Sequence, residues 1–323
     1  MGSWIAKLAL SIGGLIAAIW IFGPREPVDI DVPKDLTLDP RTLDHYFATQ
    51  EARFSDLTPG TEKRVIWAAS NGVPTPLSVL YIHGFSATSE EIRPVPDRVA
   101  QGFGANLVFT RLAGHGREGA AMAEPTVNDW MLDVAEALAA ARAVGDEVVV
   151  IATSTGGTLA ALAALDETLA DKVKGIAFVS PNFQLANPAA KLLTWPGVRW
   201  WGPLLAGRDR RFAPVNDAHA KYWTIQYPSV AVAPMAALVK FTFAQDFSAA
   251  SPPALFLYAP ADKVVSARAT EEIAQRWGGT STLAPQILPA GNDPNNHVIA
   301  GDILSPGMTD VAVSTILDWV RQL

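Results

Sequence analysis

The sequence of 323 residues contains no cysteine. Disulfide bonds, a thiol nucleophile and thiolate metal ligands are therefore excluded, whichever redox compartment the chain occupies. The five histidines are scattered along the chain and form neither an HxH nor an HExxH pattern. We therefore expect no metal site.

Charged residues are also scarce, at 18% of the sequence, and the basic ones are the rarer kind. There are 25 Lys and Arg against 32 Asp and Glu, which gives a formal net charge of −7. Nucleic-acid binding usually needs a basic face, so we expect no nucleic-acid partner. Hydrophobic residues make up 49% of the chain, which favours a well-buried core over disorder. The composition indicates no particular oligomeric state.

One long apolar run stands near the N-terminus, where residues 8–23 carry no charge. Extended back to Trp4 the run has a helical length of about 30 Å, and Lys7 can reach toward lipid headgroups. No small-x-small cleavage pattern follows it, so we favour a retained single-pass membrane anchor over a cleaved signal peptide. The slight excess of positive charge before the run places the globular part outside the cytoplasm, in the periplasm. Cleavage would instead give a secreted protein.

Apolar strands alternate with amphipathic helices along most of the remaining chain. This alternation predicts an α/β fold with a mostly parallel sheet and helices on both faces. The expected strands are 64–69, 77–83, 106–112, 147–152, 173–180, 254–259 and 286–289. The expected helices are 41–56, 90–103, 126–144, 156–170 and 267–277.

The alternation is interrupted over residues 182–253, and we expect this segment to be an inserted cap or lid. It contains 11 of the chain's 28 aromatic residues, and seven Lys or Arg against three Asp. A second small core would also explain the aromatic residues. The expected organisation is a membrane anchor or signal segment at 1–24, a linker at 25–60, an α/β core at 61–181 and 254–323, and the cap at 182–253.

A nucleophile elbow is predicted around Ser154, because Ile-Ala-Thr-Ser-Thr-Gly-Gly follows a buried strand and opens a helix. The turn of such an elbow is sharp and strained, so the residues around the nucleophile must be small. Ala152 and Gly156 satisfy this requirement at two residues before and after Ser154. A serine here could also simply cap the helix, but the preceding strand and the downstream partners favour a nucleophile.

Asp262 and His297 are the expected partners of Ser154. A serine hydroxyl needs a base to take its proton, and the base needs a carboxylate to hold its tautomer. Asp262 follows a predicted strand at the edge where sites assemble in parallel sheets. His297 lies in a loop and is the last histidine in the chain, with none between it and Asp262. Asp293, in the same loop, is the second choice for the acid.

The oxyanion of an acyl-transfer reaction needs N–H donors, each worth roughly 3–4 kcal/mol. One expected donor is the backbone N–H of Thr155, directly after the nucleophile, and the other is that of Phe85. Gly84 lets the backbone approach the site. We expect His83 to hold this loop in place rather than to take part in the chemistry.

These residues together resemble the α/β-hydrolase superfamily over roughly residues 60–323. The segment Arg-Leu-Ala-Gly-His-Gly at 111–116 resembles the LxGHG loop of one branch, which contains monoacylglycerol lipases, serine aminopeptidase-like enzymes and bacterial carboxylesterases. Trp130 and Asp133 also resemble that branch. Ala152 departs from the more usual glycine of the elbow. The resemblance implies the α/β-hydrolase fold, no cofactor, and a cap inserted after the strand that ends near Ser180.

The resemblance also implies hydrolysis of acylglycerols, small carboxylic esters or, less often, peptides. We therefore expect a membrane-anchored serine hydrolase that cleaves a small, lipophilic ester through an acyl-enzyme. Peptidase and thioesterase activities use the same three residues and remain alternatives. A non-catalytic binding protein on the hydrolase fold is a further alternative, because a fold does not prove an activity.

Overall fold

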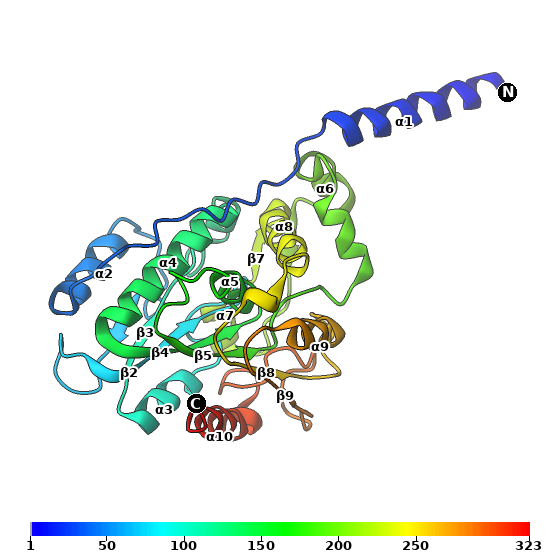
Figure 1. Cartoon of the computed structure of the whole chain (residues 1–323). Coiled ribbons are helices and arrows are strands. Elements are labelled where there is room, and N and C mark those ends of the chain that lie inside the picture. Colours follow the sequence, from blue (N-terminus) through cyan, green and yellow to red (C-terminus); the bar gives the residue numbers. More distant parts are fainter. Residues whose placement is uncertain (1) are drawn as a thin grey trace.

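The structure, a computed structural model, describes residues 2–323, apart from the side chains of residues 2, 3, 6, 8, 9, 12, 15 and 16. Its centre is a seven-stranded sheet in the order β1-β3-β2-β4-β5-β8-β9 (Figure 1). β1 is antiparallel to β3, and the other neighbouring pairs are parallel. The strands are β1 (Arg64–Ile66), β2 (Thr75–Ile82), β3 (Asn106–Phe109), β4 (Gly145–Thr153), β5 (Val173–Val179), β8 (Ala254–Tyr258) and β9 (Ser281–Pro285).

Helices cover both faces of this sheet, as the alternating pattern predicted (Figure 1). Val149 and Ile151 of β4 pack in one apolar cluster with α3 (Val95–Phe103) and α10 (Thr309–Val320). Their neighbours Val148 and Val150 point to the other face and pack with α4 (Val127–Val144), α5 (Thr155–Ala163) and α9 (Ala267–Arg276). Because successive side chains of a strand point to opposite faces, a strand buried on both sides is apolar throughout.

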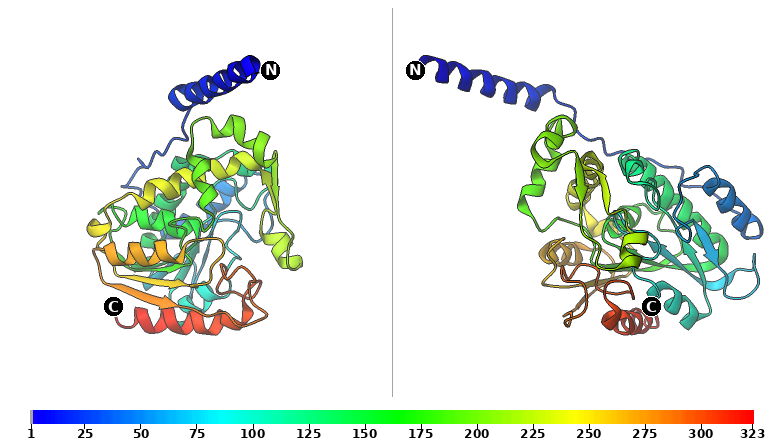
Figure 2. Two further views of the ribbon diagram at one scale, coloured as in Figure 1. Left: turned by 90° about the vertical axis from the view of Figure 1, so that its right-hand side faces the viewer. Right: turned by 180° about the vertical axis from the view of Figure 1, so that it is seen from behind.

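Helix α1 (Gly2–Phe22) projects away from the body of the molecule (Figure 2). An extended stretch then runs along the body to η1 (Pro40–Thr42) and α2 (Leu43–Glu51) (Figure 1). No helix in the described part of the chain is both long and apolar enough to cross a membrane. The predicted membrane-spanning anchor is therefore not supported, and the periplasmic location stays a prediction.

The cap segment, residues 182–253, lies between β5 and β8 in the chain and contains its own short elements. They are η3 (Pro188–Thr194), α6 (Val198–Ala206), β6 (Asp209–Arg211), α7 (Asp217–Tyr222), β7 (Gln226–Pro228), η4 (Ser229–Ala231), α8 (Val232–Phe243) and η5 (Phe247–Ala249). β6 and β7 pair antiparallel as a separate two-stranded sheet. The buried face of α8 packs against α5 and α4, so the cap segment is attached directly to the helix that follows the predicted nucleophile.

Some predicted boundaries were wrong. The last strand is Ser281–Pro285 and not 286–289, because residues 281–285 pair with β8 whereas Ile287 is 88% exposed. The helix expected from residue 90 begins at Val95, since Pro94 and Pro96 fit only the first turn of a helix. The helices expected at 41–56 and 156–170 end earlier, at Glu51 and Ala163. Two short 3₁₀ turns, η2 (Gly119–Ala123) and η6 (Pro306–Met308), complete the fold.

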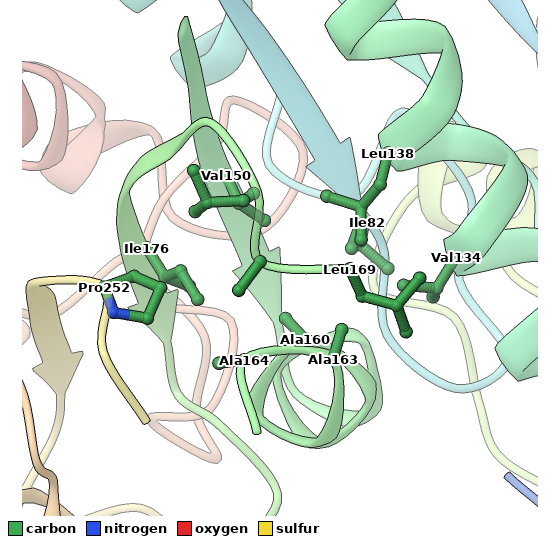
Figure 3. Close-up of a pocket in the computed structure, with 12 residues that line it drawn as sticks. Ile82, Val134, Leu138, Val150, Ala160, Ala163, Ala164, Leu169, Ile176 and Pro252 are labelled. Atoms are coloured by element: carbon green, nitrogen blue, oxygen red, sulfur yellow. The ribbon is translucent and has the colours of Figure 1, made fainter. Parts of the chain in front are cut away.

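A small void lies within the core, between the sheet and helices α4 and α5 (Figure 3). Its volume is about 10 Å³, and apolar side chains such as Ile82, Val134 and Val150 line it. A cavity needs about 10–15 Å³ and several polar partners to hold one water molecule. This void is therefore a feature of core packing and not a ligand site.

Candidate active site

Ser154 sits in a strained turn between the end of β4 and the start of α5. Its backbone has φ 49° and ψ −116°, a region that costs a non-glycine residue roughly 1–3 kcal/mol. The turn brings Gly156 against the end of β2, where an added Cβ would lie 2.6 Å from the carbonyl oxygen of His83 and closer still to that of Ile82. The close approach of two backbones explains why the sequence has glycine two residues after Ser154.

The structure brings Ser154, His297 and Asp262 into one chain of hydrogen bonds. The distance from His297 Nε2 to Ser154 Oγ is 3.1 Å, and the distance from His297 Nδ1 to Asp262 Oδ2 is 2.9 Å. The other Asp262 oxygen accepts the N–H groups of Val264 and Val265 at 2.7 and 3.0 Å. Asp262 is thereby fixed at the carboxyl end of β8, with its side chain 1% exposed. A carboxylate on Nδ1 leaves Nε2 free to accept the proton of the serine hydroxyl.

The electrostatic surroundings of His297 favour its charged form. Burial of the ring opposes the charge, but the hydrogen bond and the charge of Asp262 outweigh it and raise the pKa of His297 above 6.5. The charges of Glu91 and Asp293 act in the same direction. The His297 ring is therefore a stronger base than a free imidazole. Asp262 stabilises the imidazolium that forms when the ring accepts a proton.

Asp293, the second choice for the acid, does not touch the imidazole ring. Its Oδ2 accepts the backbone N–H groups of His297 and Val298, each at 2.9 Å, and its Oδ1 accepts that of Asn295 at 3.0 Å. Asp293 therefore shapes the loop that presents His297, while Asp262 occupies the position next to the ring.

The loop after β2 lies beside Ser154, as the oxyanion-hole prediction requires. A Cβ added to Gly84 would lie 3.0 Å from Ser154 Cβ, so only glycine allows this approach. Among the hydrogen bonds of the described residues, none uses the backbone N–H of Phe85 or Thr155. Both donors are thus available to an oxyanion.

His83 is buried beneath this loop and bonded on both ring nitrogens. Its Nε2 accepts the N–H of Leu112 at 3.1 Å, which leaves Nδ1 to donate to the carbonyl of Gly84 at 2.9 Å. Burial lowers the pKa of His83 well below 6.5. The residue is therefore a neutral tie between two loops, which is the structural arrangement expected from the sequence.

Glu91 is a site residue that sequence reasoning missed. Its carboxylate is buried and accepts the backbone N–H of Gly84 at 2.6 Å and the hydroxyl of Tyr81 at 3.0 Å. The Tyr81 hydroxyl also lies 3.1 Å from Thr153 Oγ1, beside the nucleophile. Burial raises the pKa of Glu91 to about 7, although the bond from Gly84 and the charge of His297 lower it. Glu91 therefore bonds the loop that contains Gly84 and, through Tyr81, contacts the residue before Ser154. Its charge also raises the pKa of His297.

The loop at residues 111–116 is held by the two helical residues that resemble the lipase branch. Trp130 Nε1 donates to the carbonyl of Ala113 at 3.1 Å, and Asp133 accepts the N–H of Ala113 at 2.6 Å. Arg111 forms a buried ion pair with Glu51. These contacts fix the loop whose Leu112 N–H bonds to His83.

The cap segment reaches over the candidate site from its central part. The N–H of Thr224 donates to the carbonyl of Ser86 at 2.7 Å, and the ring of Tyr227 lies edge-on to that of Phe85 at 5.6 Å. Asn216 donates to the carbonyl of Ile303, beyond the His297 loop. Ser154 is 6% exposed, so it is largely shielded from solvent. In the described part of the chain, no group of three or more His, Asp or Glu residues could hold a metal ion.

Comparison with known families gives one clear result. The model of the family described as serine aminopeptidase, S33, matches residues 75–286, about two thirds of the chain. A thermostable monoacylglycerol lipase of Bacillus sp. (strain H-257) is 34% identical over 91 residues. These residues are 28% of this chain and 35% of that relative, so the match spans about a third of the relative's length.

Solved structures show the α/β-hydrolase fold. One comes from the work on LipS and LipT, two metagenome-derived lipolytic enzymes, and has a TM-score of 0.65 at 20% identity, with 83% of this chain and 100% of that chain covered. Another is a soluble variant of monoglyceride lipase from Saccharomyces cerevisiae, with a TM-score of 0.60 at 12% identity and coverages of 83% and 96%. A third is a monoacylglycerol lipase from Paleococcus ferrophilus, with a TM-score of 0.57 at 15% identity. This match covers 81% of this chain and 99% of that chain. The fold predicted from the sequence is therefore confirmed.

Proposed function

The chain belongs to the serine aminopeptidase, S33, family, and from this premise we propose that it is a lipase- or esterase-type hydrolase that cleaves carboxylic esters with Ser154, His297 and Asp262. The observation that carries the proposal is the continuous chain of hydrogen bonds from Ser154 Oγ through the His297 ring to Asp262. This chain lies in the strained strand–turn–helix setting that presents a nucleophile.

In the proposed reaction His297 takes the proton of Ser154 as the serine oxygen attacks the ester carbonyl carbon. The N–H groups of Phe85 and Thr155 stabilise the oxyanion of the tetrahedral intermediate. His297 then gives its proton to the departing alcohol, and an acyl-enzyme remains on Ser154. Water repeats the sequence with His297 as base, which releases the carboxylic acid and restores the serine.

The composition of the cap segment favours a substrate with an apolar acyl group. It is rich in aromatic residues, and Tyr227 contacts Phe85 directly beside the proposed oxyanion hole. The relatives named above are monoacylglycerol lipases and lipolytic enzymes. We therefore place the substrate among acylglycerols and short- or medium-chain esters.

An aminopeptidase must bind a substrate ammonium group, which an acidic pocket would favour. The cap segment instead has seven Lys or Arg against three Asp, which favours an ester over a peptide with a free amino terminus. Thioester cleavage by the same residues is the closest alternative.

The test is hydrolysis of p-nitrophenyl esters from C2 to C12 and of 1-lauroylglycerol by the full chain and by Ser154→Ala. We expect turnover with a preferred chain length in the wild type and a loss of at least about 10⁴-fold in the variant. Leucine p-nitroanilide and lauroyl-CoA serve as peptidase and thioesterase substrates. Labelling of Ser154 by a fluorophosphonate probe without turnover of any ester would overturn the ester proposal. Absence of labelling as well would indicate a binding protein on the hydrolase fold.

A further inference from the structure

Residues of the cap segment and residues at the C-terminal end of α1 line a second pocket. This end of α1 is where the projecting helix meets the body (Figure 1). The pocket encloses about 450 Å³ and is lined by residues of η3, α8 and the stretch that follows β5, together with Trp20 and Arg25. This volume is within the range of about 300–1,000 Å³ that is usual for small-molecule sites.

The α1 side of this pocket is fixed to the cap segment by several contacts. The rings of Trp20 and Trp195 meet edge-on at 5.5 Å, and the N–H of Gly197 donates to the carbonyl of Pro24 at 2.7 Å. Arg199 forms a two-bond ion pair with the buried carboxylate of Glu26. The wall contributed by the N-terminal stretch is thus tied to the cap segment and is part of a built pocket.

Apolar and cationic side chains line the pocket, together with the uncharged polar residues Gln184, Asn187, Thr194 and Ser266. Trp195 is exposed and Leu185 and Phe243 are half-buried, so these three lining residues supply accessible apolar surface. Lys191, Lys240 and Arg25 are exposed among the lining residues. None of these three cations forms an ion pair within the described part of the chain, and no carboxylate lines the pocket.

We propose that this pocket binds one acyl chain of an amphiphile with an anionic headgroup. The acyl chain would lie against the accessible apolar surface of Leu185, Trp195 and Phe243, where burial of each methylene is favourable. The headgroup would take the place between Lys191, Lys240 and Arg25, whose charges find no acidic partner in the pocket. A free fatty acid and a phospholipid of an anionic bilayer share this chemistry.

This site is distinct from the candidate active site. No lining residue belongs to the group Ser154, His297 and Asp262 or to the proposed oxyanion hole. The lining residue nearest to them in sequence is Ser266, which caps α9 four residues after Asp262. Binding here therefore does not depend on the proposed hydrolytic activity.

The test is binding of laurate to the full chain by titration calorimetry, below the concentration at which laurate forms micelles. We expect affinity to rise roughly fourfold for each methylene added between octanoate and laurate. The double variant Lys191→Gln/Lys240→Gln should weaken laurate binding roughly five- to tenfold. The matched control is Arg268→Gln, an exposed cation on α9 outside the lining, which should leave the affinity unchanged.

A photoreactive diazirine analogue of laurate locates the bound chain independently of any reaction at Ser154. Crosslinks to η3 or α8 residues, mapped by mass spectrometry, support the proposal. Crosslinks confined to the Phe85 and His297 loops would place laurate in the active site and overturn it. Equal affinity for laurate and dodecyltrimethylammonium, unaffected by the double variant, would also overturn it.

The two sources of the headgroup are separated by a vesicle experiment. Co-sedimentation of the chain with phosphatidylglycerol vesicles, reduced by the double variant and not by Arg268→Gln, in a chain that does not bind free laurate, identifies a bilayer phospholipid as the ligand. Binding of free laurate without such co-sedimentation identifies a fatty acid. Failure of both ligands to bind would overturn the proposal, whatever the outcome with esters.

Discussion

At the carboxyl ends of the strands, Ser154 is 6% exposed and the side chains of Asp262 and His297 are 1% and 12% exposed. In the cap segment above them, Leu204 and Leu205 of α6 are 82% and 79% exposed. The first region is held by hydrogen bonds between buried polar groups, whereas the second presents apolar and cationic side chains to its surroundings. The floor of the site, which consists of Ser154, His297, Asp262 and their hydrogen-bond partners, is therefore preorganised, whereas Leu204 and Leu205 of the cap segment are largely open to solvent.

This difference implies that substitutions in the two regions have different effects. Polar groups held in a buried setting are costly to disturb, because each lost hydrogen bond leaves an unsatisfied partner. Exposed side chains can change at little cost to the fold. Substitutions in the floor should therefore change rate or stability strongly, and substitutions in the cap segment should change binding by smaller amounts.

The largest effect is expected for Asp262→Asn. The amide would present the wrong hydrogen-bonding group to His297 Nδ1, and we expect kcat for the best ester to fall about 10⁴-fold. Asp293→Asn should instead lower the free energy of unfolding by about 1–3 kcal/mol with a smaller loss of rate, because Asp293 bonds only backbone N–H groups of its loop. Steady-state kinetics and urea unfolding of both variants decide the matter. Equal losses of kcat would contradict the assignment of Asp262 as the acid.

Alanine substitutions at two glycines, one in each region, compare how tightly the two regions are packed. Gly156→Ala would push a Cβ against the backbone carbonyls of Ile82 and His83, so we expect a loss of about 3 kcal/mol or more in the free energy of unfolding. Gly202→Ala, inside α6, meets only Val198 Cγ2 at 3.4 Å and should stabilise the helix by about 0.5–1 kcal/mol. Urea denaturation midpoints measure both changes. A Gly156→Ala variant as stable as the wild type would show that the elbow can relax.

The floor was also the part that the sequence predicted best, because its residues lie in short local patterns. Ser154 follows the buried strand β4 and opens a helix, and Asp262 follows β8, which is two places from β4 in the sheet. These positions meet at one edge of a parallel sheet regardless of the details of packing. The sequence placed Ser154, Asp262 and His297 together for this reason, and their chemical roles are part of the proposal.

Elements outside such patterns were missed. Glu91 lies in irregular chain between β2 and α3, and its contact with Gly84 depends on the three-dimensional path of that loop. The prediction for β9 was displaced because four of its five residues are exposed and the fifth is half-buried, and an exposed edge strand has no apolar run. In the cap segment Pro203 lies inside α6, which hides a helix from a search for regular periodicity.

Glu91 tests whether the buried polar floor depends on charge as well as on geometry. Because its pKa is raised to about 7 by burial, the stability that protonated Glu91 contributes is fully present below about pH 4.5 and is lost as the pH rises through 7. Glu91→Gln removes this dependence, so the variant should gain up to about 3 kcal/mol relative to the wild type between pH 5 and 8. Urea unfolding at several pH values measures the difference.

The same variant should change the kinetics in a defined direction. Without the charge of Glu91 the pKa of His297 falls, so the acidic limb of the kcat/KM profile should move to lower pH. Glu118→Gln, at an exposed residue with no side-chain hydrogen bond, is the matched control and should alter neither property. A wild-type pH profile in Glu91→Gln would mean that Glu91 acts by geometry alone.

The smallest effects are expected at the exposed arginines of the cap segment. Arg208, Arg210 and Arg211 are solvent-exposed at β6, and the cap segment has seven Lys or Arg against three Asp. If this surface meets anionic headgroups, each Arg→Ser change should weaken partitioning onto phosphatidylglycerol vesicles by about 1 kcal/mol, roughly fivefold. The kcat for a soluble short-chain ester should not change, since the floor is untouched. Partitioning that is unchanged in all three variants would remove this face from lipid contact and leave the pocket beside α1 as the cationic site to examine.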